Sequence, residues 1–172
     1  MVEYFRHLHS KVQSKNSIIF SYTTLNASAK LLLMKTNTSV IPDPVRDLLI
    51  QAAKWAARTA YCTYSHSPVG AAVLMADGQV YTGCNVENAS FGLSMCAERI
   101  AIFKALSHGN RAFAALAVVG GTPKKPSTPC GACRQVMSEF MTPETSVYIA
   151  PLKSGKPTAT TLGTLLPNAF VK

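Results

Sequence analysis

The sequence predicts one α/β domain in which a mixed sheet is covered by helices. From residue 41 onward, segments with a helical spacing of apolar residues alternate with short β-rich runs. No internal repeat or low-complexity stretch interrupts this part of the chain. With 172 residues and 48% hydrophobic side chains, the chain has the size and apolar content of a single domain with its own core.

The first half of this domain is predicted to form a helix followed by a hairpin. Asp43 can cap a helix whose first turn suits Pro44, and apolar residues then recur at helical spacing to about Tyr61. Two short apolar runs, over 69–74 and 79–85, flank an Asp-Gly pair at Asp77. Asp-Gly between two such runs is a strong hairpin signal, so we expect two antiparallel strands.

The second half continues the alternation of helices and strands. We expect a helix over 95–106, a buried strand over 113–120, a Pro- and Lys-rich loop, a helix over 130–140, a strand over 146–150 and a short terminal helix over 162–170. Because the elements alternate, the helices are expected to cover a single sheet.

Residues 1–40 have a different composition from the predicted domain, 41–172. They are rich in Ser, Thr, Asn and Lys, contain a single acid, Glu3, and show no sustained period. We therefore expect a disordered basic extension. Such composition is typical of organelle-targeting peptides. The alternatives are a dispensable extension of a cytoplasmic protein, or a misplaced start with Met34 as the true first residue.

The formal net charge of +9 raises the possibility of a nucleic-acid partner. Its distribution argues against one, since +4 falls within residues 1–40 and the domain has no basic run beyond Lys124 and Lys125. No uninterrupted apolar stretch approaches the roughly 18 residues of a membrane-spanning helix. We therefore expect neither nucleic acid nor a membrane as partner.

Three of the five cysteines predict a zinc site. The chain lacks a recognisable secretory signal peptide, so a reducing compartment is favoured over a disulfide framework. Cys130 and Cys133, three residues apart at a helix start, can direct both sulfurs to one ion, and Cys96 would come from the start of another helix. A catalytic zinc has three protein ligands and leaves the fourth position to water. We therefore expect one Zn²⁺ per chain.

Glu98 lies two residues after Cys96, where a carboxylate can reach a water on the metal without binding the metal itself. Cys-Ala-Glu followed by Pro-Cys-x-x-Cys is the pattern of zinc deaminases, with the Glu as general acid and base. Two alternatives stay open. Cys-Gly-Ala-Cys can be a redox pair, which leaves Cys96 without a role, or Cys62 or Cys84 can complete a structural zinc site.

Beyond these motifs, the chain resembles the small homotetrameric cytidine deaminases from about residue 61 to residue 170. The similarity rests on residues 61–66, 68–72, 83–89, 96–99, 127–136 and 165–167, with Phe170 at the end. The resemblance implies a three-layer cytidine-deaminase-like sandwich. It implies hydrolysis of free cytidine or 2′-deoxycytidine to the uracil nucleoside, with release of ammonia, in pyrimidine salvage. It also implies a homotetramer with shared active sites.

The resemblance further implies roles for single residues. Asn85 and Glu87 would hold the ribose 3′-hydroxyl, which alternate residues of a strand can reach together. Arg99 would donate hydrogen bonds to the thiolates. In the expected mechanism, the backbone N–H of Ala97 steadies the bound hydroxyl or substrate. Phe170 would help to close a neighbouring subunit's pocket, although it can equally cap its own core.

Two positions depart from the family pattern. Ser67 occupies a position where the family usually has a bulky residue, often Phe, and Phe91 lacks the hydroxyl of the Tyr often found there. A rival within the same chemistry is a deaminase that acts on nucleic acid or on a cytosine-bearing antibiotic. The residues predicted to grip the 3′-hydroxyl favour a free nucleoside, because they leave no room for a following phosphate.

Overall fold

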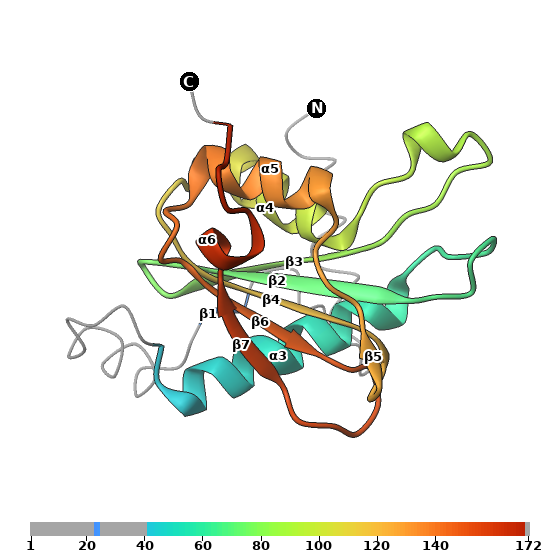
Figure 1. Ribbon diagram of the computed structural model, residues 1–172, viewed down its shortest axis with the longest axis horizontal. Coiled ribbons are helices and arrows are strands. Elements are labelled where there is room, and N and C mark those ends of the chain that lie inside the picture. Colours follow the sequence, from blue (N-terminus) through green and yellow to red (C-terminus); the bar gives the residue numbers. More distant parts are fainter. Residues whose placement is uncertain (1–22, 25–40, 171–172) are drawn as a thin grey trace, which may run out of the picture.

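The computed structural model describes residues 23–24 and 41–170. One mixed sheet lies between two helical layers, with α3 on one face and α4 and α5 on the other (Figure 1). The strands follow the order β1-β3-β2-β4-β6-β7, and β5 pairs with β4 off this path. The α/β fold with a helix-covered mixed sheet, predicted from the sequence, is therefore confirmed.

The helices and strands that were predicted lie close to their predicted positions, whereas β1, β5, β7 and η2 were not predicted. The strands are β1 (Thr23–Thr24), β2 (Val69–Met75), β3 (Gln79–Cys84), β4 (Phe113–Thr122), β5 (Lys125–Pro126), β6 (Ser146–Ala150) and β7 (Thr158–Thr161). The helices are α3 (Asp43–Ala56), η1 (Ala57–Thr59), η2 (Phe91–Leu93), α4 (Ala97–Ser107), α5 (Gly131–Phe140) and α6 (Leu162–Leu165).

The sheet is buried on both faces. In β2, Ala72 and Leu74 belong to the core under α3, whereas Val73 and Met75 belong to the core under α4 and α5. This alternation follows from the period of two along a strand. Because both faces are apolar, the polar active groups must come from the edge of the sheet where the strands end.

The topology brings the starts of α4 and α5 to one edge of the sheet. Since β2 is antiparallel to both β3 and β4, the last two run in the same direction. The carboxyl ends of β3 and β4 therefore lie on the same side, and the chain leaves each strand toward one of the two helices. The parallel β4–β6 pair then requires the crossover through α5.

Two glycines allow helices to approach the sheet closely. A Cβ atom on Gly70 would lie 2.0 Å from the carbonyl oxygen of Ala53 on α3. A Cβ atom on Gly83 would lie 2.4 Å from the carbonyl oxygen of Ala97, the first residue of α4. At the outer edge of β3, the Lys104 ammonium of α4 donates a hydrogen bond to the carbonyl of Thr82 over 2.6 Å.

The structure corrects three details of the prediction. The first helix was expected to reach Tyr61, but α3 ends at Ala56 and continues only as the short 3-10 helix η1. The terminal helix ends at Leu165 rather than Phe170, since Pro167 follows and proline restricts the residue before it. The edge strand β7, Thr158–Thr161, was not predicted.

Most of the predicted extension, residues 1–40, lies outside the described residues, so its disorder and its targeting role stay predictions. Within it, Thr23–Thr24 pair with β3 opposite Val80 and Gln79. In the described part of the chain, no helix has the length and apolar character to cross a membrane.

Candidate active site

The candidate site is formed where the first turns of α4 and α5 meet. Cys96 is the N-cap residue of α4, and Cys130 is the N-cap residue of α5, both with extended backbone. Cys133 lies one turn into α5 and is buried. The first N–H groups of a helix have no partner within it, so this junction favours negatively charged sulfur.

The three cysteine sulfurs fit a zinc ion. The Sγ atoms of Cys96 and Cys130 lie 3.8 Å apart, and those of Cys130 and Cys133 lie 3.5 Å apart. All three lie within 4.8 Å of one another. Sulfurs bound about 2.3 Å from a tetrahedral zinc ion are separated by about 3.8 Å. Both the spacing and the donor chemistry therefore suit zinc.

The two remaining cysteines do not complete a four-sulfur site. Neither Cys62 nor Cys84 belongs to the metal-ligand cluster. The Sγ atom of Cys84 instead lies 3.6 Å from the Thr59 hydroxyl, which donates to it. A set of three thiolates leaves one position of a tetrahedral metal open, as catalytic zinc requires.

The environment of Cys96 favours its thiolate. A hydrogen bond from Cys133, followed by the effect of the Arg99 guanidinium, lowers the pKa of Cys96 to about 5 against the opposing effect of burial. The same hydrogen bond raises the pKa of Cys133. Arg99 Nη2 lies 3.6 Å from Cys96 Sγ and 3.3 Å from the carbonyl oxygen of Ser94. The guanidinium predicted to serve the thiolates therefore lies against one of them.

Glu98 is the buried carboxyl group of the site. Only 3% of its surface is exposed, and burial raises its pKa to about 7. It lies in the first turn of α4, two residues from Cys96. A carboxyl with a pKa near neutrality can both accept and donate a proton in this environment. Ala97, between the two, is also buried and is the first residue of the helix.

The residues predicted to bind ribose contact the loop that precedes β2. The Asn85 amide accepts a hydrogen bond from the N–H of Val69 over 2.8 Å and donates one to the carbonyl of Ser67 over 3.1 Å. The Glu87 carboxylate accepts hydrogen bonds from the N–H groups of Tyr64 and Ser65 and from the Ser65 hydroxyl. Both side chains therefore brace this loop.

The comparisons with known proteins place this geometry in a family. Residues 45–149 match the family model described as "Cytidine and deoxycytidylate deaminase zinc-binding region". Over 124 residues the chain is 52% identical to a cytidine deaminase from Sporosarcina psychrophila. This alignment covers 72% of this chain and 90% of the relative. The chain belongs to the cytidine deaminase family. This confirms the predicted family, the enzyme class and zinc as the metal.

Solved structures agree with this assignment. The crystal structure of the cytidine deaminase from Burkholderia pseudomallei matches with a TM-score of 0.68 at 52% identity, over 72% of this chain and 98% of that one. The cytidine deaminase from Mycobacterium tuberculosis matches with a TM-score of 0.63 at 41% identity, over 74% and 98%. The described domain of this deaminase thus spans nearly the whole length of both structures.

Phe170, the predicted contributor to a neighbouring pocket, does not cap the core of its own chain. In a single chain of this deaminase, 74% of the surface of Phe170 is exposed. Large exposed side chains also occur at Phe91 and Leu93 in η2, and the Phe91 ring lies edge-on to Tyr64 with the centroids 6.0 Å apart. The prediction that Phe170 serves a neighbour stays open, and these side chains are apolar surface available for a subunit contact.

Two further residues contact the site, and no role was predicted for either from the sequence. Ser65 donates its hydroxyl to Glu87, and the Arg134 guanidinium contacts the carbonyl of Pro129, directly before Cys130. Both lie within the stretches that resemble the family, and this is the one sequence signal that could have found them.

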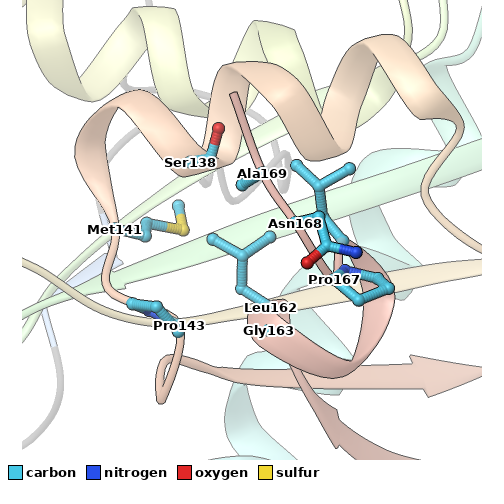
Figure 2. A pocket seen from close by; sticks show the side chains of 9 residues that line it. Ser138, Met141, Pro143, Leu162, Gly163, Pro167, Asn168 and Ala169 are labelled. Atoms are coloured by element: carbon cyan, nitrogen blue, oxygen red, sulfur yellow. The ribbon is translucent and has the colours of Figure 1, made fainter. Parts of the chain in front are cut away.

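An apolar cavity lies apart from the cysteines, at the far end of α5. Figure 2 shows Ser138 of α5 and Met141, the residue directly after α5, at this cavity, with Leu162 and the chain from Pro167 to Ala169 around it. It has a volume of about 320 Å³. None of the predicted zinc ligands lines this cavity, so it is separate from the chemical centre of the deaminase.

Proposed function

We propose that this deaminase hydrolyses the amino group of free cytidine and 2′-deoxycytidine to give the uracil nucleoside and ammonia. One observation carries the proposal: Glu98 is buried, with its pKa raised to about 7, beside three sulfurs spaced for zinc. Relatives that share 52% of aligned residues are named cytidine deaminases.

Cys96, Cys130 and Cys133 would hold the zinc ion. Bound zinc supplies Lewis-acid chemistry, which lowers the pKa of water to about 7. Three thiolates outweigh the charge of Zn²⁺ and would make that water a weaker acid, so a nearby cation is needed to offset them. Arg99, which lies 3.6 Å from the sulfur of Cys96, supplies that positive charge.

Glu98 moves the protons of the reaction. Its carboxylate takes a proton from the attacking water, whose oxygen forms the new bond to C4 of the pyrimidine. The carboxyl gives this proton to N3, then takes the proton of the new hydroxyl group on C4 and gives it to the amino group. The C4–N bond breaks as the C4 carbonyl forms, so that water and the cytosine nucleoside become ammonia and the uracil nucleoside. The backbone N–H of Ala97, at the start of α4, would donate to the oxygen on C4.

The ribose would be held by Asn85 and Glu87. Their carboxylate and amide groups keep hydrogen-bonding capacity beyond the loop contacts, since each oxygen has two lone pairs. A grip on the 3′-hydroxyl excludes a polymer, in which that oxygen bears a phosphate. The proposed substrate is therefore a free nucleoside rather than nucleic acid. The proposed metabolic role is pyrimidine salvage.

We propose a homotetramer in which Phe170 reaches into a neighbour's pocket. Support comes from the exposed ring of Phe170 and from the apolar surface at Phe91 and Leu93. The five cysteines, none of which is paired in a disulfide, suit a reducing compartment such as the cytoplasm. The location of a fluorescent fusion of the full chain reports on that compartment.

The function is tested by Glu98→Gln, with Cys96→Ala as a matched metal-site variant. Glu98→Gln keeps the side-chain size and the three sulfurs but removes the proton carrier. We expect turnover of cytidine and 2′-deoxycytidine to fall by at least about 100-fold while zinc content stays at the wild-type level. Cys96→Ala should lose zinc as well as activity. Metal analysis and the ultraviolet change on deamination give both readouts.

Near-normal turnover in Glu98→Gln would contradict the proposed mechanism. Turnover of blasticidin or of single-stranded DNA, without turnover of the nucleosides, would instead favour the rival substrates. Disulfide reductase activity in a zinc-free protein would favour a redox function for Cys130 and Cys133.

A further inference from the structure

The guanidinium of Arg134 connects two separate parts of the deaminase. Its Nε atom donates to the carbonyl of Pro129 over 2.8 Å, and its Nη1 atom donates to the carbonyl of Leu165 over 2.7 Å. Pro129 directly precedes Cys130, whereas Leu165 is the last residue of α6. One side chain on α5 thus contacts both the metal-binding turn, 129–133, and the start of the C-terminal segment, 165–170.

Leu165 and Leu166 pack against the core, but the rest of the C-terminal segment is mostly exposed. Pro167, Asn168 and the Phe170 ring are exposed, and the backbone of Asn168 has a positive φ of 58°. Beneath it lies the apolar cavity of about 320 Å³ shown in Figure 2. Gln135 adds a second contact, since its Nε2 atom donates to the carbonyl of Phe170 over 2.9 Å. Hydrogen bonds from α5 therefore hold this segment at both ends.

We propose that Arg134 is a positioning residue that orders the metal-binding turn and the C-terminal segment together. This inference rests on the proposed function at one point only, which is the proposed role of Phe170 at the active site. If the segment moves away, Arg134 loses the carbonyl of Leu165 and holds the carbonyl of Pro129 less firmly. If the turn relaxes because the metal leaves, the same guanidinium releases the segment.

The chemistry of arginine suits this coupling. Pro129 is fully buried, so its carbonyl has no access to bulk water and needs a donor from the protein. A guanidinium presents several N–H groups in a rigid fork, and two of them here reach two carbonyls from different segments. A lysine ammonium keeps the charge but lacks the rigid fork, so it cannot keep both contacts in the same geometry.

The proposal is tested with Arg134→Lys and with Gln135→Ala as the matched control, both in the full chain. Two readouts are used: the rate of zinc release to a chromogenic chelator, and hydrogen exchange of the amides in 165–170 relative to those of β2. We expect Arg134→Lys to release zinc at least about tenfold faster, as loss of a charge-assisted hydrogen bond predicts. Gln135→Ala should free only the Phe170 end of the segment and leave the Leu165 contact in place, so zinc release should change less than about twofold.

The coupling itself is measured by comparing metal-loaded and metal-free protein. In the wild type and in Gln135→Ala, removing zinc should speed exchange in 165–170 more than in β2. In Arg134→Lys this extra response should disappear. The coupling would be overturned by a wild-type segment whose hydrogen exchange does not respond to zinc, or by an Arg134→Lys variant with faster segment exchange and normal zinc release. An equal rise in exchange across the whole chain would also overturn it. No turnover enters these readouts, so failure here is distinct from failure of the proposed reaction.

Discussion

Glu87, the proposed ribose ligand, is a carboxylate that organises a loop. The hydrogen bond from the Ser65 hydroxyl, and after it those from the N–H groups of Tyr64 and Ser65, hold its pKa below the ordinary value of 4.5. A carboxyl with a depressed pKa stabilises the folded loop when it is ionised. The contribution of the ionised Glu87 carboxylate to the stability of the folded protein is complete above pH 4.5, and it is lost as the pH falls through the lowered pKa.

We expect Ser65→Ala to weaken substrate binding rather than the chemical step. Without the hydroxyl, the carboxylate of Glu87 loses one of its donors and its fixed orientation, while Glu98 and the cysteines are untouched. KM for cytidine should rise by about three- to tenfold, with kcat changed by less than about twofold. Acidification below the pKa of Glu87 should raise the wild-type KM toward that of the variant.

Ser67→Ala is the matched control for this prediction. It removes a hydroxyl from the same loop, but that hydroxyl contacts the carbonyl of Ser65 and not the carboxylate of Glu87. Steady-state kinetics of the three proteins from neutral to acid pH distinguish the two cases. An equal rise in KM for both variants would mean that the loop, and not the Glu87 contact, sets binding.

At the residue scale, sequence reasoning reached the groups whose motifs are local. Cys130, Cys133 and the Cys96–Glu98 pair carry their chemistry in spacings of two or three residues, which a helix start converts directly into proximity. Ser65 escaped because its partner lies 22 positions away, across a loop of irregular backbone. The two backbone carbonyls that Arg134 contacts could not be predicted from the sequence either, because every residue has a backbone carbonyl.

Gly83 sets the position of a whole element. A Cβ atom here would lie 2.4 Å from the carbonyl oxygen of Ala97 and 2.6 Å from the nitrogen of Ala101. Both are backbone atoms of α4 and cannot rotate away as a flexible side chain would. The missing side chain therefore lets the helix that carries Cys96 and Glu98 rest directly on β3.

We expect Gly83→Ala to push α4 away from the sheet. The overpacking should lower the free energy of unfolding by about 1–3 kcal/mol or more, and it should lower zinc affinity because Cys96 moves with the helix. Urea unfolding and a zinc titration measure the two effects. In the control, Gly131→Ala, an added Cβ meets no atom within 4 Å, so both values should stay near wild type although Gly131 adjoins Cys130. Unchanged zinc affinity in Gly83→Ala would contradict this account.

At the element scale, periodicity located the long segments better than their ends or the edge strand. The apolar pattern of α3 continues past Ala56, and it cannot show that the last turn tightens into η1. The strand β7, Thr158–Thr161, is half-exposed and lacks an apolar run, although its threonines favour strands. Pairing with β6, rather than its own pattern, makes it a strand.

At the scale of the whole molecule, the proposed homotetramer has shared active sites, in which Phe170 of one chain acts in the site of a neighbouring chain. This can be tested by co-expressing Phe170→Ala chains with Glu98→Gln chains. Each variant alone should be impaired. In mixed tetramers, a site with an intact Glu98 can receive an intact Phe170 from the other chain. We therefore expect partial recovery of activity, with a four-chain mass by light scattering.

The control replaces the Glu98→Gln partner with the double variant Glu98→Gln, Phe170→Ala, which supplies neither group. Recovery should then be absent. A fully active monomer, or recovery that is equal with both partners, would rule out a shared site. The assembly could be expected only through the family resemblance, because no local pattern marks Phe170 as a residue that leaves its own core.

The outer edge of β3 bears on how this molecule avoids aggregation. An unpaired strand edge is a template on which the strand of another molecule can be added. Here Gln79 and Val80 pair with β1, and the next outward carbonyl, that of Thr82, is held by the Lys104 ammonium. An incoming strand would either have to displace the Lys104 ammonium from the Thr82 carbonyl or bury the charge of the ammonium beside the new strand's backbone. The Lys104 contact therefore makes this edge a poor template for a strand of another molecule, and it comes from the helix whose first turn holds Glu98.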